Sequence, residues 1–483
     1  MEKRHWKLLL LIGISFHFIA AYMMPIGLDA HVHATYVTDQ IDDGEGHLEW
    51  GELRQDSSDG STPVEYSSED RWFVWHLIIQ IWFTLFGVSI LAMHALGLFI
   101  GLGCLATIFF VTKNLFNEEQ ALKITALASI YPPLIRATGR LYQEGAILII
   151  STLAIYCIIK ALRNKNEYKW WIFPIVSIFI IASFKGMPLW MGVCAIIGIY
   201  LSSRINMNLL IFVVVSIVVE LFVVYRNNIS LMDSNIIPAL LSSFIAAVIF
   251  LYLAALLGRN TPKLESSDSM MIQNGVYLIM AGLIGWIAGL WVTEAHIANA
   301  SIFETLYTLR NNPRYLTLLF TPLLFIRLLN NNSYELINNQ NRGIAHSFII
   351  IMVIINAAVL SYTVGERGTQ IIGQQLGDEI TEQQDILFIS DSDLPMHRMY
   401  SMHITIDPES DDSNLAIWRT SDSGWENELL ECEELANVHW IVVDYTGIDL
   451  IPENWQTVEI DTDETINSGY QLLRWSEDNE RCP

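Results

Sequence analysis

Runs of about 20 apolar residues recur along this chain of 483 residues and constrain its fold more than any other feature. A bilayer core about 30 Å thick needs roughly 20 apolar residues for each helical crossing. Hydrophobic residues make up 52% of the chain and charged residues 16%, compared with roughly a quarter in ordinary soluble domains. The sequence therefore predicts a mainly α-helical, multi-pass protein of the lipid bilayer of the cell membrane.

Eleven candidate crossings form the predicted transmembrane bundle. They lie near residues 8–24, 88–112, 120–137, 145–162, 170–184, 187–203, 208–226, 234–258, 272–292, 314–330 and 346–364. Lys and Arg collect in joints such as residues 160–169, which marks those joints as cytoplasmic. The N-terminus is then cytoplasmic and the C-terminus extracytoplasmic. An odd number of crossings places the two termini on opposite sides of the membrane. To keep the number odd, the apolar stretch from Trp72 to Leu85 is expected to be an interfacial or re-entrant helix.

The net charge of −24 is concentrated in two segments. Residues 25–71 carry 12 acids and 2 bases, and residues 365–483 carry 27 acids and 5 Arg, which leaves +8 for the remainder. We expect a transmembrane domain over residues 1–364, whose first extracytoplasmic loop is 25–71, and an acidic extracytoplasmic soluble domain over residues 365–483. Such acidity argues against nucleic acid as a partner, because like charges repel.

The tail has the alternating apolar pattern of short strands. Asp385–Ser390, Ala416–Trp418 and His439–Asp444 are separated by polar turns, which predicts a small α/β or mostly β domain. Cys432 and Cys482 both lie in this tail. They could form a disulfide if the tail is extracytoplasmic, or stay unpaired.

Ionisable residues gather at the predicted outer ends of the helices. Asp29, His31 and His33 follow the first apolar run, where they could act as a base or as metal ligands, or form a solvated turn. Glu144 opens an apolar helix, where it is either functional or a helix cap. Basic residues at this side either reach lipid headgroups or bind an anion; they are Arg136, Arg140, Lys185, Arg226, Arg310 and Arg314.

Four short motifs occur in an order that resembles one known family. They are Leu85-Phe-Gly-Val-Ser89, the Arg-rich joint ending in Gln143-Glu144, Ser183-Phe-Lys-Gly-Met-Pro188, and Pro313-Arg-Tyr-Leu316. Over about residues 8–330 the chain resembles membrane glycosyltransferases of the GT-C fold. The similar branch contains dolichyl-phosphate-mannose protein mannosyltransferases and the lipid A aminoarabinose transferase.

The resemblance implies inverting transfer of a sugar from a polyprenyl-phosphate donor to an acceptor hydroxyl outside the cytoplasm. The acceptor can be a protein, a lipid or a glycan. The resemblance implies that Asp29 and Glu144 are catalytic residues, with Asp29 as the base or as a residue that orients the acceptor. The residues that would cradle the donor phosphate are Lys185, Arg314, Tyr315, Arg140 and Arg136.

Two points remain open at the level of sequence. The family commonly has Asp-Glu where this chain has Asp29-Ala30, so His31 or His33 could replace the second carboxylate and hold a divalent metal ion. The alternative function is a transporter or a flippase for lipid-linked sugars. Transporters usually show repeated halves and polar residues at midmembrane, and neither is evident in this sequence.

Overall fold

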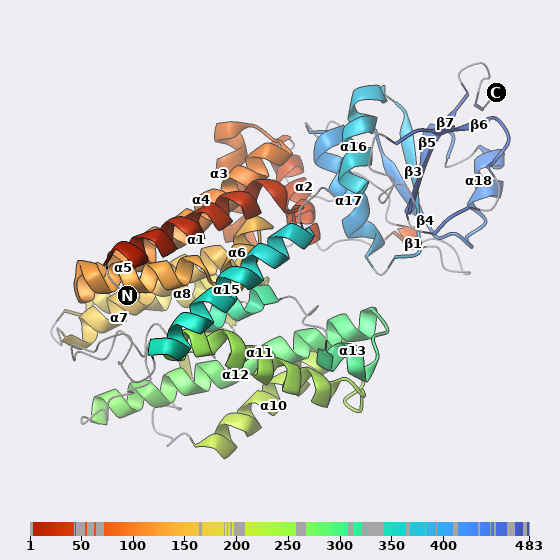
Figure 1. Ribbon diagram of the computed structural model, residues 1–483. Coiled ribbons are helices and arrows are strands. Elements are labelled where there is room, and N and C mark those ends of the chain that lie inside the picture. Colours follow the sequence, from red (N-terminus) through yellow and green to blue (C-terminus); the bar gives the residue numbers. More distant parts are fainter. Residues whose placement is uncertain are drawn as a thin grey trace. The chain divides into compact units, whose positions relative to one another are not determined.

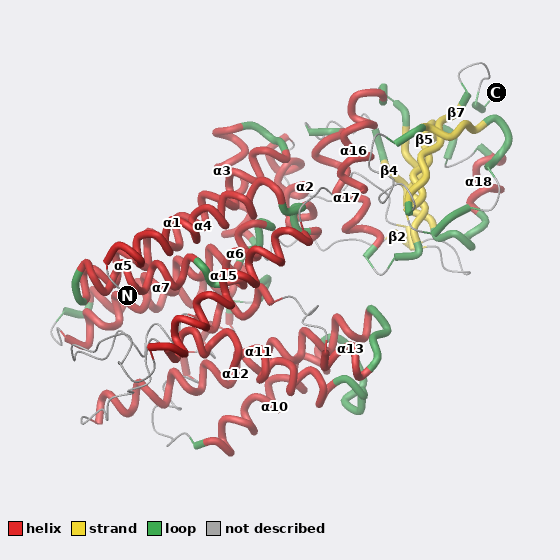
Figure 2. Tube along the Cα trace, in the orientation of Figure 1, coloured by secondary structure: helices red, strands yellow, loops and turns green. Residues whose placement is uncertain are grey.

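The computed structural model of the protein describes residues 3–42, 44, 54–55, 62–63, 72–163, 167–187, 189–190, 192–193, 196–197, 208–256, 267–307, 313–320, 342–363, 368–381, 383–392, 394–408, 414–432, 435–444, 446–448, 451–460, 469–476 and 481–482. These residues are mostly helical, with a small sheet near the C-terminus (Figures 1 and 2). The chain forms two compact units. The helical unit comprises residues 1–22 and 97–363, and the α/β unit comprises residues 23–96 and 364–483.

The helices of the first unit include most of the predicted crossings. They are α1 (Lys3–Met23), α4 (Ile90–Leu115), α5 (Glu118–Ser129), α6 (Pro132–Gly139), α7 (Glu144–Arg163), α8 (Lys169–Phe184), α10 (Leu209–Arg226), α11 (Ile236–Leu256), α12 (Ser267–Ile297), α13 (Ile302–Tyr307), the 3₁₀ helix η1 (Pro313–Leu316) and α15 (Arg342–Thr363).

Five described helices are long and apolar enough to cross a membrane, by length and composition: Lys3–Met23, Ile90–Leu115, Glu144–Ala161, Leu209–Arg226 and Asn274–Ile297. They support a multi-pass membrane protein, whereas the count of eleven crossings stays a prediction. For the predicted crossings at 187–203 and 314–330, more than half of the residues lie outside the described part of the chain.

The expectation of one continuous helix at 120–137 differs from the structure. Helix α5 ends at Ser129 and α6 begins at Pro132, with Tyr131 in an extended conformation between them. Proline disfavours a helical conformation in the residue before it, so the chain breaks there. The side-chain amide of Asn356 donates to the carbonyl of Ile130 at 2.8 Å, which satisfies a group freed by the break.

Two glycines of α12 allow a close approach of α10 in the helical unit. A Cβ atom added at Gly285 would lie 2.1 Å from the carbonyl oxygen of Ser216, and one at Gly289 would lie 2.5 Å from Cβ of Val223. The hydroxyl of Ser216 donates to the carbonyl of Ala281 at 3.0 Å. This is the small-residue packing that membrane helices use, since it brings the backbones together.

Four helices of this unit end in the same hydrogen-bonded turn. After α6, α8, α10 and α12 a residue with positive φ follows the C-cap, and the amide of the next residue donates to the carbonyl five residues before it. The four residues with positive φ are Leu141, Gly186, Asn228 and Asn299. This Schellman turn satisfies carbonyls that the helix leaves open. Gly and Asn tolerate positive φ, whereas Leu141, at φ 55°, adopts a conformation that is unfavourable for its side chain.

The C-terminal part of the α/β unit contains a five-stranded mixed sheet. Its strands are β3 (Asp385–Ser390), β4 (Ala416–Arg419), β5 (Val438–Asp444), β6 (Trp455–Val458) and β7 (Tyr470–Trp475), in the order β4-β3-β5-β7-β6. Strand β3 is parallel to β4 and β5, with Phe388 opposite both Trp418 and Val442, and β7 is antiparallel to β5 and β6. The three predicted strands are confirmed, and the domain is α/β rather than mostly β.

Helices cover both faces of this sheet. The crossover from β3 to β4 and the crossover from β4 to β5 run in opposite directions across the sheet, and right-handed crossovers then place their helices on opposite faces. Figure 1 shows α16 (Gly368–Glu379) and α17 (Pro395–Ile406) on one side and α18 (Trp425–Glu431) on the other. Tyr400 and Trp440 belong to the core under α16 and α17, and Trp425 belongs to the core under α18.

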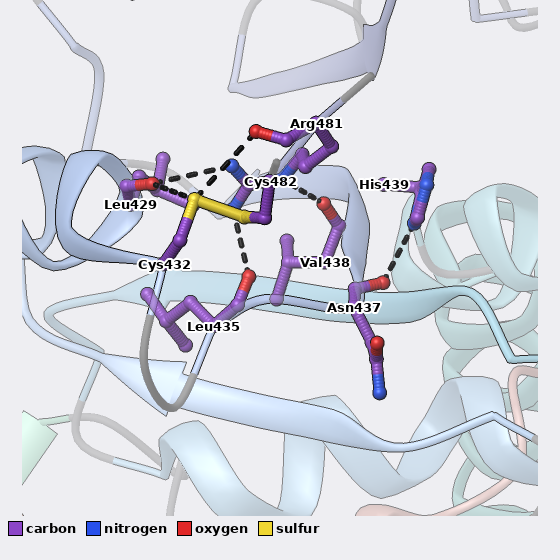
Figure 3. Close-up of a disulfide and its surroundings, with 8 residues drawn as sticks. All are labelled: Leu429, Cys432, Leu435, Asn437, Val438, His439, Arg481 and Cys482. Atoms are coloured by element: carbon purple, nitrogen blue, oxygen red, sulfur yellow. Dashed lines mark hydrogen bonds between the residues drawn. A yellow bond between two sulfur atoms is a disulfide. The ribbon is translucent and has the colours of Figure 1, made fainter.

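Cys432 and Cys482 form a disulfide that ties the end of α18 to the chain terminus (Figure 3). The neighbouring Arg481 guanidinium donates to the carbonyl oxygens of Val438, Leu435 and Leu429. Burial lowers the pKa of Arg481. The structure thus decides between the two states left open for this cysteine pair.

The first loop and the stretch after it contribute helices to the α/β unit. They are α2 (Leu28–Asp42) and α3 (Phe73–Phe86), besides the two-residue strands β1 (Arg54–Gln55) and β2 (Thr62–Pro63). One face of α3 is buried, through Trp75, Ile79 and Phe83, while Leu77 and Ile81 are exposed. The stretch is helical, as expected, whereas its interfacial or re-entrant position stays a prediction.

Candidate functional site

A charged cluster lies within the helical unit, where the α6–α7 turn, the end of α8 and η1 contact each other. Two Schellman turns set its geometry: Arg140 is the C-cap of α6, and Lys185 is the C-cap of α8. Tyr131, just before α6, donates its hydroxyl to the carbonyl of Leu316 at 2.8 Å, which anchors η1 to this turn. Helices α6, α7, α8 and η1 thus hold the side chains of the cluster in fixed positions.

An ion pair between Glu144 and Lys185 forms the centre of the cluster. Lys185 Nζ donates to Oε1 of Glu144. The side chain of Glu144 is 1% exposed and that of Lys185 is 13% exposed. The other carboxylate oxygen, Oε2 of Glu144, is buried without a hydrogen-bond partner among the described groups. Buried carboxylates require compensating charge, which Lys185 and the nearby Arg314 supply.

Aromatic rings hold the two cations of η1 and α8. The Arg314 guanidinium lies 3.9 Å from the ring centre of Tyr142 and donates from Nη2 to the hydroxyl of Tyr315 at 2.8 Å. Lys185 Nζ lies 5.5 Å from the ring centre of Tyr315 and 5.7 Å from that of Trp286. Cation–π contacts of this kind favour the charged forms and fix where the cations point.

Arg136 and Arg140 add two positive charges beside Arg314. Arg140 and Arg314 act electrostatically on Arg136, as does the carboxylate of Glu294. The Nε atoms of Arg136 and Arg140 are buried without a hydrogen-bond partner among the groups that the structure describes. Four cations therefore gather with two carboxylates, and the net positive charge suits an anionic ligand.

The structure brings together every predicted phosphate-binding residue that sequence reasoning named, and Glu144 with them. Arg226 instead ends α10 in an exposed position, and Arg310 lies outside the described residues. Sequence reasoning missed Tyr142, Trp286 and Glu294. Tyr142 stands inside the Arg-rich joint and could have been noticed, whereas Trp286 lies in an apolar run that gives no sign of its role.

Asp29, the predicted base, belongs to the α/β unit and lies in the first turn of α2. Its side chain is 43% exposed, and its Oδ1 lies 3.9 Å from Nε2 of His397 in α17. The expected loop around Asp29 is thus a helix.

The two candidate metal ligands have different neighbours. His31 accepts a hydrogen bond of 3.0 Å from the amide of Gln370, while His33 shares a 3.0 Å hydrogen bond with His76. Among the residues described, no group of three or more His, Cys, Asp or Glu side chains could hold a metal ion. The divalent metal stays a prediction, and no step proposed below is routed through one.

No family model matches the chain, and a search of curated proteins finds no match either.

Proposed function

We propose that the protein is a membrane glycosyltransferase that moves a sugar from a polyprenyl-phosphate donor to an acceptor hydroxyl on the extracytoplasmic side. The observation that carries the proposal is the gathering of Arg136, Arg140, Lys185 and Arg314 around the buried Glu144. A phosphate that leaves with the electrons of the glycosidic bond gains negative charge, and preorganised cations stabilise that charge.

The cations have distinct tasks in this mechanism. Arg314, fixed between the rings of Tyr142 and Tyr315, offers a planar fork that suits two phosphate oxygens. Lys185 supplies a point charge that Glu144 orients. The other oxygen of Glu144, Oε2, has no hydrogen-bond partner among the described groups and would accept from a hydroxyl of the acceptor or of the donor.

The general base of the proposed mechanism is Asp29, which belongs to the α/β unit. It accepts the proton of the acceptor hydroxyl while the oxygen of that hydroxyl attacks the anomeric carbon and the bond to phosphate breaks. One displacement of this kind inverts the configuration at the anomeric carbon. A half-exposed carboxylate suits this task, because an acceptor can reach it.

A transfer assay tests the proposal. The purified full-length protein is mixed with labelled polyprenyl-phosphate hexoses and pentoses and with membranes as the source of acceptor, and the labelled product is identified. Donor affinity should fall by about 1.5 to 3 kcal/mol in Arg314→Ala and in Lys185→Ala. Arg226→Ala, which removes an exposed cation outside the cluster, is the matched control.

The catalytic base is tested separately from the donor site. Asp29→Asn keeps the shape of the side chain, so transfer should slow by roughly a hundredfold or more while donor affinity is kept. If the wild-type protein binds the donor and moves it across vesicle membranes but releases no polyprenyl phosphate, the protein is a flippase and the proposed transferase activity is wrong.

A further inference from the structure

We infer that His397 of the acidic C-terminal domain positions the carboxylate of Asp29, the proposed base, within the α/β unit. The inference rests on the proposed function and extends it to a segment outside the region of resemblance. Figure 1 shows α17 of this domain beside α2 of the first loop, and the two helices pack against each other within the α/β unit.

The contact between the two residues is direct. Nε2 of His397, in the first turn of α17, lies 3.9 Å from Oδ1 of Asp29, in the first turn of α2. The His397 side chain is 24% exposed, so the pair lies at the rim of the helix contact where an acceptor can reach it. The distance is too long for a hydrogen bond, but it is within the range of an ion pair.

The rest of the helix contact is buried and fixes both helices. Six residues after Asp29, Thr35 shares a 3.1 Å hydrogen bond with His403, and two residues after Asp29, His31 accepts from the amide of Gln370. All four of these side chains are at most 2% exposed. Val32 packs against the apolar core under α16 and α17. Hydrogen bonds between buried partners set the rotation of α2 about its axis, and that rotation decides where Asp29 points.

This geometry explains how His397 would act. With a proton on Nε2 it can donate to Oδ1 of Asp29 and so fix the direction in which the carboxylate faces. Catalytic contacts of this kind are often long in the absence of substrate. His397 is thus a positioning residue that acts through Asp29.

The experiment compares variants of the full-length protein in the transfer assay. His397→Ala should lower kcat about tenfold or more with an unchanged KM for the donor, since the orientation of the base is lost while the phosphate site is intact. His397→Gln carries an amide nitrogen at about the reach of Nε2 and should restore most of kcat. His397→Asn is too short and should behave like His397→Ala. His439→Ala, in β5 of the same domain, is the matched control and should match the wild type.

A double variant tests that His397 acts through Asp29. In the Asp29→Asn background, His397→Ala should cause no further loss of kcat, because the carboxylate it positions is already absent. If Asp29→Asn and His397→Ala lower kcat independently, so that their effects multiply in the double variant, the inference is overturned. A wild-type kcat in His397→Ala would also overturn it. Equal losses of kcat in His397→Gln and His397→Ala would overturn it as well. Absence of any transfer by the wild type is a different result, which removes the proposed function and this inference with it.

Discussion

Lys185 and Glu144, which are 41 residues apart in the sequence, form a buried ion pair that joins the end of α8 to the first residue of α7. Neither charge could stay buried alone at low cost. The pair therefore has a structural role of its own besides its proposed role at the donor phosphate, and the two roles can be separated by experiment.

Removal of Lys185 should destabilise the fold more than removal of both partners. Lys185→Met leaves Glu144 buried with fewer compensating charges and should lower the free energy of unfolding by about 3 kcal/mol or more. Adding Glu144→Gln should recover about 1 to 3 kcal/mol of that loss. Denaturant unfolding of the protein in detergent measures both values.

The matched control for this cycle is the pair of Lys123 and Glu119 on α5, whose Glu119 side chain is 65% exposed. Its coupling should not exceed about 0.5 kcal/mol. Additive effects of Lys185→Met and Glu144→Gln would contradict the structural role of the buried pair.

Gly285→Ala should destabilise the packing of α10 on α12. Its Cβ atom would lie 2.1 Å from a backbone oxygen of Ser216, so the two helices must separate, which should cost about 1 to 3 kcal/mol. Gly282→Ala, one turn earlier in α12, has no atom within 4 Å of the added Cβ and should be tolerated. Thermal unfolding of the two variants in detergent provides the comparison. Equal melting temperatures would contradict the close approach of these helices.

Loss of the disulfide should destabilise the C-terminal domain. Cys432 and Cys482 are 50 residues apart, so the chain-entropy estimate gives up to about 4 kcal/mol for the closed loop. Limited proteolysis of Cys482→Ser should cut the tail earlier than in the wild type. Cys157→Ser, which changes a free thiol of α7, is the control. Equal resistance of Cys482→Ser and the wild type would argue that the bond is absent from the protein.

The stability of the α/β unit should fall as the pH is lowered from about 6.5. Burial lowers the pKa of His403 from its ordinary value of 6.5 to about 3. Between these values the unfolded chain binds a proton that the folded chain does not, so unfolding is favoured by up to about 1.4 kcal/mol per pH unit. His403→Asn keeps a hydrogen-bonding group near Thr35 but does not titrate. The variant should therefore show a shallower dependence of melting temperature on pH between 6 and 4, and an unchanged slope would contradict a buried, neutral His403.

Much of the architecture could be predicted because it depends on local pattern. Apolar runs long enough for a bilayer identified the helices, and alternating residues identified the strands beginning at Asp385, Ala416 and Val438. Helix α2 could not be predicted in this way. Its sequence, Leu28–Asp42, is polar and rich in His, Thr and Val, which are weak helix formers, so packing against α3 and α17 must stabilise it.

The same distinction between local pattern and packing applies to the candidate site. The sequence by itself determined which charged residues stand at helix ends, because Lys, Arg and Glu are exceptional next to apolar runs. Only the tertiary structure decided that Arg314 stacks on Tyr142, that Lys185 pairs with Glu144, and that His397 faces Asp29. These partners lie from 41 to 368 residues apart and share no local pattern, so only the packing of helices and the turns that end them could bring them into contact.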